Sequence, residues 1–129
     1  MTRYLTEEWM ELALKTAESL PERRGANGRL QYVLTGGPDG GEIRYYWILE
    51  NGRLTGAACG QVDDPDFTVT MTYADSVLIE KGELSDEDAY AQGRTKFTGS
   101  MSKAMRLMPL LNSAEFKEVQ DRIRAATEF

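Results

Sequence analysis

The sequence has no histidine and only one cysteine, Cys59, among its 129 residues. Histidine is the commonest general base and metal ligand, so its absence makes a Ser-His-Asp or Cys-His catalytic site impossible. Zinc sites need several cysteine or histidine ligands, which this chain does not supply. A single cysteine also allows no disulfide within the chain, and nothing points to an oxidising compartment. We therefore expect neither a metal nor a cofactor.

Positive charge is scarce as well. The chain has 15 Lys and Arg against 21 Asp and Glu, a formal net charge of −6. Nucleic-acid binding depends on clustered cations that neutralise phosphates, and the densest basic segment here is Arg23-Arg24, with Arg29 nearby. An acidic chain can still carry a basic face. The overall balance nevertheless argues against nucleic acid and against anionic membrane surfaces as partners.

Long apolar runs are absent too. No segment approaches the roughly 18 apolar residues of a membrane-spanning helix, and the opening MTRYLTEEW has acids where a signal peptide is apolar. We expect a cytoplasmic protein with no stable membrane insertion. A hydrophobic content of 41% and a charged content of 28% are typical of a globular protein. The length is that of a single domain, so we expect residues 1–129 to form one.

The hydrophobic period is helical at first and then changes to two. Thr6, followed by two glutamates, predicts a helix start, and Pro21 predicts its end. Alternating apolar and polar residues then predict four strands joined by short turns, an antiparallel meander over residues 29–35, 43–50, 53–60 and 67–72. Asn51-Gly52 predicts a type I′ hairpin turn, because both central residues of that turn need positive φ.

Helices dominate the second half. We predict helices over residues 73–81 and 85–92, a strand over 94–98, and a helix that starts at Ser100 or Ser102 and is disturbed by Pro109. Asn112 or Ser113 caps a last helix. Because helices and sheets each bury one face, the order predicts an α+β fold. It has a five-stranded, mainly antiparallel sheet with helices packed on one face.

Few residues suggest catalysis. Asp63, Asp64 and Asp66 could act as an acid/base pair or hold a hard cation, but an exposed turn is the simpler interpretation. Cys59 lacks a histidine to activate it and lies in a predicted strand beside two alanines, which favours a small buried or half-buried residue. We therefore expect no enzyme.

A methionine stripe suggests binding. Met101, Met105 and Met108 recur at helical spacing, and methionine is flexible enough to adapt to ligands of variable shape. The stripe could equally be part of an ordinary core. Trp47, in the middle of a predicted hairpin, has the same two interpretations.

The segment from Asp66 to Leu111 resembles the sterol carrier protein-2-like (sterol-binding) domain family. A Thr-rich strand is followed by an aspartate that opens a short helix, then a glycine, an Ala-aromatic-x-x-Gly segment, and a short strand that ends in glycine. These features are Phe67–Thr72, Asp75, Gly82, Ala89–Gly93 and Lys96–Gly99.

The resemblance implies a five-stranded sheet covered by helices, with an apolar cavity between them and no chemistry of its own. It implies binding or carriage of a lipid such as a fatty acid, a fatty acyl-CoA or a sterol. Arg106 or Lys103 could meet an acidic head group at the mouth. The alternative is an interaction module with a filled cavity, for example a homodimer. We expect the lining to be formed by Trp47, Phe67, Val69, Met71, Val77, Leu78, Met101, Met105, Met108 and Leu111.

Overall fold

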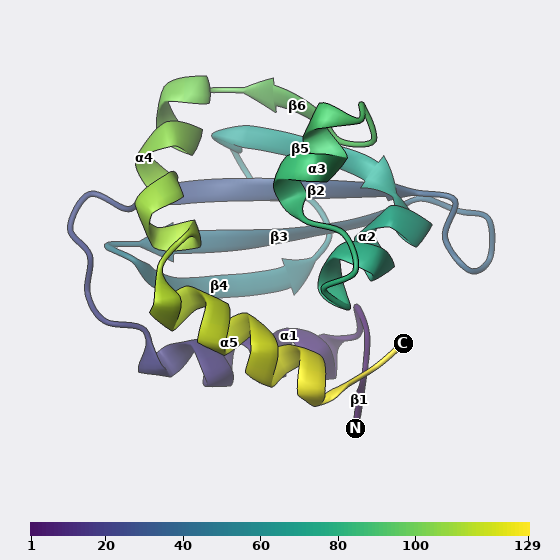
Figure 1. Ribbon diagram of the computed structural model, residues 1–129, viewed down its shortest axis with the longest axis horizontal. Helices are drawn as coiled ribbons and strands as arrows, with labels where there is room; N and C mark the ends of the chain where they lie inside the picture. Colours follow the sequence, from purple (N-terminus) through teal and green to yellow (C-terminus); the bar gives the residue numbers. More distant parts are fainter.

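The computed structural model describes residues 1–129 as two layers, a five-stranded sheet and a set of helices in front of it (Figure 1). Three of the four strand pairings are antiparallel, and the strand order is β4-β3-β2-β5-β6. This confirms the predicted fold class. The strands are β2 (Gly28–Thr35), β3 (Ile43–Glu50), β4 (Arg53–Cys59), β5 (Phe67–Thr72) and β6 (Lys96–Gly99).

The helices begin where side-chain oxygens cap them. Thr6, Ser85, Ser100 and Ser113 each accept a hydrogen bond from the backbone N–H three residues on, which settles the two alternative caps left open by the sequence. The helix that Ser100 caps contains Pro109 and continues to Leu111. The proline that was expected to disturb this helix therefore does not end it. The helices are α1 (Glu7–Thr16), α2 (Tyr73–Glu80), α3 (Asp86–Ala91), α4 (Met101–Leu111) and α5 (Ala114–Ala125), with a short 3-10 turn, η1 (Ala17–Ser19).

The predicted four-strand meander is wrong in one connection. β2, β3 and β4 follow one another as antiparallel neighbours, and Asn51 (φ 48°) and Gly52 (φ 81°) form the expected tight turn. β5, however, lies on the other side of β2 and runs parallel to it, with Leu30 opposite Phe67. The chain must therefore cross the sheet between Cys59 and Phe67, where the sequence suggested only a turn.

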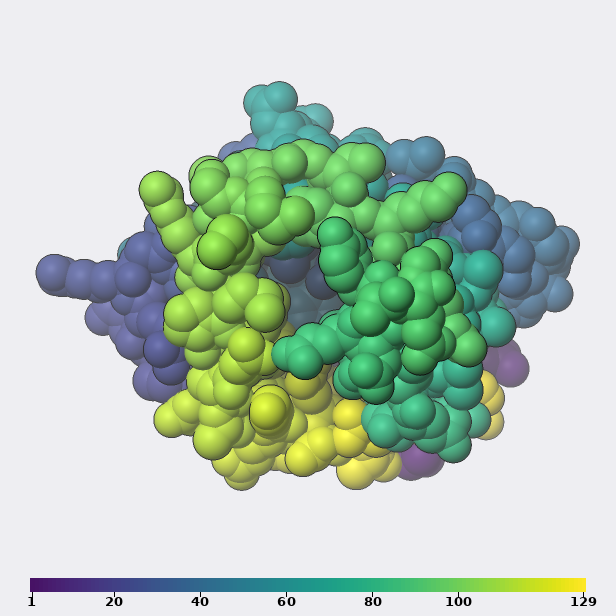
Figure 2. Space-filling view, turned by 45° about the horizontal axis from the view of Figure 1, so that its top comes forward, coloured from purple at the N-terminus to yellow at the C-terminus, as the bar shows by residue number.

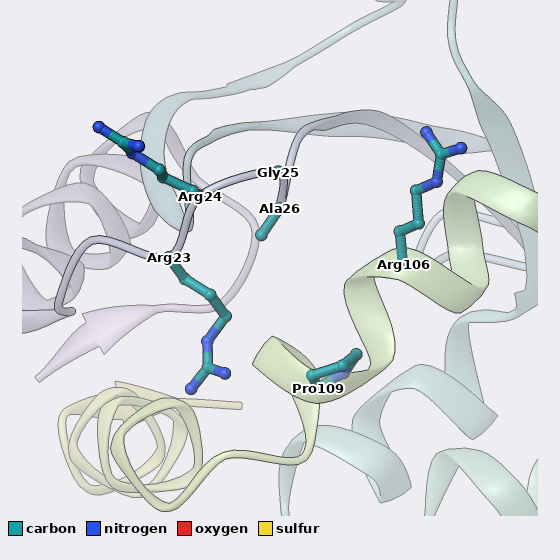
Figure 3. A pocket seen from close by; sticks show the side chains of 6 residues that line it. All are labelled: Arg23, Arg24, Gly25, Ala26, Arg106 and Pro109. Atoms are coloured by element: carbon teal, nitrogen blue, oxygen red, sulfur yellow. The ribbon is translucent and has the colours of Figure 1, made fainter.

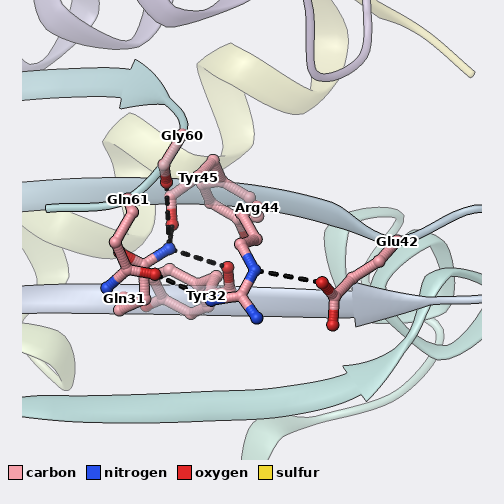
Figure 4. A network of polar contacts seen from close by, with 7 residues as sticks. All are labelled: Gln31, Tyr32, Glu42, Arg44, Tyr45, Gly60 and Gln61. Atoms are coloured by element: carbon pink, nitrogen blue, oxygen red, sulfur yellow. Dashed lines mark hydrogen bonds and ion pairs between the residues drawn. The ribbon is translucent and has the colours of Figure 1, made fainter.

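The side chain of Gln31 holds this crossing segment (Figure 4). Its amide nitrogen donates to the carbonyl oxygens of Gly60 (3.0 Å), Tyr45 (3.1 Å) and Tyr32 (3.2 Å), and its oxygen accepts from the N–H of Val62 (2.8 Å). Gln31 is fully buried. The crossing segment thus obtains from one side chain the backbone partners that a neighbouring strand would otherwise supply.

The core lies between the helices and one face of the sheet. Alternate strand residues, such as Leu30, Leu34 and Leu49, pack with buried residues of α1, α4 and α5 in one continuous cluster. The opposite face carries Gln31 and the crossing segment. The helices therefore cover a single face, as predicted from the order of the elements.

The two ends of the chain lie side by side (Figure 1). β1 (Thr2–Arg3) pairs in parallel with β7 (Thr127–Glu128), a small sheet that sequence reasoning missed. The indole N–H of Trp9 donates to the hydroxyl of Thr127 at 3.0 Å, which ties α1 to the end of the chain. Among the helices, none combines the length and the apolar character needed to cross a bilayer.

The first prediction concerns Gln31→Leu. A buried leucine leaves the N–H of Val62 and the carbonyl oxygen of Gly60 without their partner, so we expect a loss of about 2–4 kcal/mol in the free energy of unfolding. Urea titration followed by circular dichroism measures it. Gln61→Leu, at an exposed position of the same segment, is the control and should change stability by less than about 1 kcal/mol. Equal losses of stability in the two variants would show that Gln31 does not hold the crossing segment in place.

Candidate functional site

The helix-facing side of the sheet is apolar and largely aromatic at its centre. Trp47 of β3 lies opposite Leu30 and Ala57, and Val69 of β5 lies opposite Tyr32 and Phe97. Strand alternation puts Phe67 and Met71 on the same side as Val69. The four strand residues expected in the lining thus share one face.

The surface above this face is hollowed between α4 and the α2–α3 pair (Figure 2). α4 forms one side of the hollow, α3 the other, and β6 closes its upper edge, while sheet atoms are visible at the bottom. The hollow is open to solvent in this view. It is the place where the predicted cavity would lie.

α4 turns three different sides to its surroundings. Leu107 and Leu110 are buried in the core. Arg106 and Pro109 line a pocket shared with the loop at residues 23–26 (Figure 3). At 100° per residue, Met101, Met105 and Met108 fall on the outer side of the helix, away from Leu107 and Leu110. Met101 and Met108 lie about 140–160° from Arg106, whereas Met105 lies only about 40° from Pro109 and points outward. The three methionines are 52%, 66% and 41% exposed, so they do not form a closed core.

The ten expected lining residues occupy three depths. Phe67 and Met71 are buried within the packed core. Trp47, Val69, Val77 and Leu111 are half-buried and pack against that core, and Leu78 is also half-buried. The methionines lie at the surface. The structure therefore places these residues on the helix-covered side of the sheet, at depths that range from the packed core to the exposed surface of α4.

Sequence reasoning missed several apolar residues of this region. Tyr32 and Phe97 are half-buried on the inner face, and Tyr32 stacks on Tyr45 with ring centroids 4.7 Å apart and planes 6° apart. Tyr90 of α3 is 59% exposed. The alternation Leu30-Tyr32-Leu34 was the available signal for Tyr32, whereas an exposed tyrosine on a short helix gives none.

A group of tyrosines and acids lies at the α2 end of the inner face. Tyr4 donates a hydrogen bond to Ser76 at 3.3 Å. Burial raises the pKa of Glu80 to about 7; the nearby carboxylate of Asp86 adds to the rise and Arg124 opposes it. Burial, together with the charges of Asp86 and Glu80, also raises the pKa of Tyr32 well above its usual value. This region favours uncharged groups.

One polar atom of the floor lacks a partner. The indole nitrogen of Trp47 is buried and makes no hydrogen bond. Its ring lies 6.4 Å from that of Trp9, so apolar surface surrounds it. A buried donor without an acceptor is costly, and an acceptor that reached it would lower that cost.

The cations expected at the mouth lie elsewhere. Lys103 forms an ion pair with Asp66 at 3.0 Å, and Arg106 lies on the far flank of α4. Partial burial acts to raise the pKa of Asp66, but hydrogen bonds from the Arg29 N–H and from Lys103 outweigh it and lower this pKa. Asp66 therefore joins β2 to α4, a structural role. A polar pocket of about 450 Å³ lies beside this ion pair.

Nothing in the geometry activates the remaining catalytic candidates. Cys59 is exposed, contrary to the expectation of a buried or half-buried residue, because it ends the edge strand β4. Partial burial of the sulfur, with the charge of Glu7 nearby, raises the pKa of Cys59, which makes its thiolate less available. The sulfur donates weakly to the carbonyl oxygen of Leu5 at 3.6 Å. The structure contains no group of three or more Cys, Asp or Glu side chains arranged to hold a metal ion.

Known proteins resemble this chain over most of its length. The family model described as the SCP-2 sterol transfer family matches residues 7–112. Human sterol carrier protein 2 is 31% identical over 84 residues, which are 64% of this chain and 15% of that protein. The match thus spans a small part of the curated relatives.

Solved structures share the fold. A conserved hypothetical protein of Thermus thermophilus superimposes with a TM-score of 0.72 at 19% identity, over all of this chain and 93% of that one. A palmitated sterol carrier protein 2-like protein from Aedes aegypti gives 0.64 at 21% identity, over 84% of this chain and 95% of that one.

The second prediction concerns Glu80→Gln. Because the pKa of Glu80 is raised from 4.5 to about 7 on folding, the folded state holds the proton more tightly, and stability falls as the pH rises through this window. We expect the free energy of unfolding of the glutamine variant to exceed that of the parent by about 2–3 kcal/mol at pH 8. At pH 4.5 the two free energies should differ little. Urea titrations at the two pH values measure the gap. Glu83→Gln removes the same charge at an exposed neighbouring position and is the control. A gap for Glu80→Gln that is the same at both pH values would contradict the assignment.

Proposed function

Because the chain belongs to the SCP-2 sterol transfer family, we propose that it binds and carries a lipid in the hollow between α4 and the α2–α3 pair. The proposed carrier is a single domain of residues 1–129 that acts in the cytoplasm without catalysis. The observation that carries the proposal is the exposure of Met101, Met105 and Met108 beside an apolar, aromatic sheet face. Exposed large apolar side chains gathered on one helix are a feature of binding surfaces.

The apolar sheet face beneath the hollow supports a ligand with a long apolar part. Burying a 16-carbon chain yields up to about 12 kcal/mol at about 0.8 kcal/mol per methylene, before the costs of association. Methionine side chains adapt to occupants of different length. The palmitated state of the Aedes aegypti relative also supports a fatty acyl chain as one ligand.

The third prediction tests the methionine flank. Met108 is 41% exposed, so Met108→Glu should fold, while its charge lies on the side of α4 away from Arg106 and opposes an apolar ligand in the hollow. We expect at least a tenfold rise in the Kd of a fluorescent fatty acid, measured by titration and by displacement with unlabelled lipids. Ala114→Glu, which adds the same charge at an exposed position of α5, should leave Kd unchanged.

Native mass spectrometry gives an independent result. A retained lipid adds a few hundred daltons to the mass of the monomer. A doubled mass with no lipid, together with no displacement by any lipid up to its solubility, would contradict carriage and support the alternative of a dimerisation module.

A further inference from the structure

Three arginines gather around a pocket of about 310 Å³ on the far side of α4 from the hollow. Arg23, Arg24 and Arg106 line it together with Gly25, Ala26 and Pro109 (Figure 3). Acids outnumber bases in the chain by 21 to 15, yet no carboxylate forms an ion pair with any of these three guanidinium groups. Among the other twelve cations, Arg44, Arg94, Lys103 and Arg124 have carboxylate partners and the remaining eight have none.

The loop that carries two of these arginines is held firmly by the β3–β4 turn. The N–H of Arg23 donates to the carbonyl oxygen of Asn51 at 2.7 Å, and the N–H of Gly52 donates to that of Ala26 at 2.9 Å. The side chain of Asn27 accepts from the N–H of Asn51 at 2.8 Å. The approach is so close that a Cβ at Gly52 would lie 2.7 Å from that of Arg23. The backbone of the pocket is therefore preorganised, and the three guanidinium groups have no ion-pair partner there.

The side chains are spread apart. Arg23 extends between the loop and the end of α4, Arg106 rises from α4 away from Arg23, and Arg24 points away from the helix (Figure 3). Like charges repel, so this spread is expected when no anion lies between them. Arginine presents a planar fork that binds phosphate oxygens in pairs, and several forks around one pocket favour a multiply charged anion.

We propose that this pocket binds a phosphate group, carried by a lipid head group or by a soluble organic phosphate. The site is separate from the hollow, because the loop at residues 23–26 and α3 lie on opposite sides of α4 (Figure 1). It does not depend on lipid carriage. The net charge of −6 does not exclude it, since the pocket itself is lined by three cations and no acid.

Inorganic pyrophosphate serves as the probe in the fourth prediction. Titrated at constant ionic strength and pH 7, it should give saturable shifts of the backbone amide NMR signals of Gly25, Ala26 and Arg106, with a Kd on the order of 1 mM or below. The double variant Arg23→Gln, Arg106→Gln should raise Kd at least tenfold. The Kd of Arg106→Lys should lie between those of the parent and the double variant, because lysine keeps the positive charge but lacks the two parallel N–H donors of a guanidinium group.

The control removes the same number of charges elsewhere. Arg3→Gln with Lys96→Gln changes two exposed cations that have no ion pair and do not line the pocket; Kd should stay within twofold of the parent. Shifts that do not saturate, or an equal weakening in the control, would overturn the proposal. Unchanged thermal unfolding of both variants shows that the comparison is between folded proteins.

Vesicles distinguish the two sources of the phosphate. Phosphatidylcholine vesicles with and without 20% phosphatidic acid are sedimented with the protein. Retention that needs phosphatidic acid and is lost in Arg23→Gln, Arg106→Gln assigns the site to a lipid head group. Pyrophosphate binding without such retention assigns it to a soluble organic phosphate. If neither pyrophosphate nor phosphatidic acid binds, the proposed phosphate site is wrong. That outcome would not affect the proposal that a fatty acid binds in the hollow.

Discussion

The parallel pairing of β2 with β5 constrains the rest of the molecule. It forces the chain to return across the sheet in the few residues between Cys59 and Phe67, too short a distance for a helix. The returning segment lies flat on the back of the sheet, where Gln31 supplies its hydrogen bonds. All the helices are thereby left on the front. The hollow exists on that face because α4 and the α2–α3 pair approach the same strands from opposite ends and do not meet (Figure 2).

α4 separates two chemically different surfaces. Its buried side, Leu107 and Leu110, fixes it to the core, and the ion pair of Lys103 with Asp66 fixes its first turn to the start of β5. With rotation about its axis prevented in this way, the methionines lie on the outer side of α4 and Arg106 faces the loop. The apolar and the cationic surfaces therefore belong to one rigid element, although they point in different directions.

Local signals in the sequence predicted local structure well. Thr6 and Ser85 cap the helices that they were expected to start, and strict alternation gave the inward face of β3 and β5 correctly. Long-range pairing left no such signal: a turn at Asp63–Asp66 and a crossing of the sheet look alike in sequence. Gln31 could not be distinguished from a solvent-facing strand residue. Helical spacing placed the three methionines on one stripe, but only the packing of Leu107 shows which way that stripe points.

The openness of the hollow has an energetic reason. An enclosed empty cavity of about 300 Å³ would cost about 7 kcal/mol, which is comparable to the whole stability of a domain of this size. An open hollow has no such void, because water fills it. The remaining cost is the exposed apolar surface of the methionine flank and the floor, at about 25 cal/mol per Å². An apolar ligand removes that surface from water and so stabilises the folded state, by an amount that rises with the logarithm of its concentration once that exceeds Kd. In the proposed carrier, the same exposed methionines that weaken the empty protein therefore contribute to its affinity for a ligand.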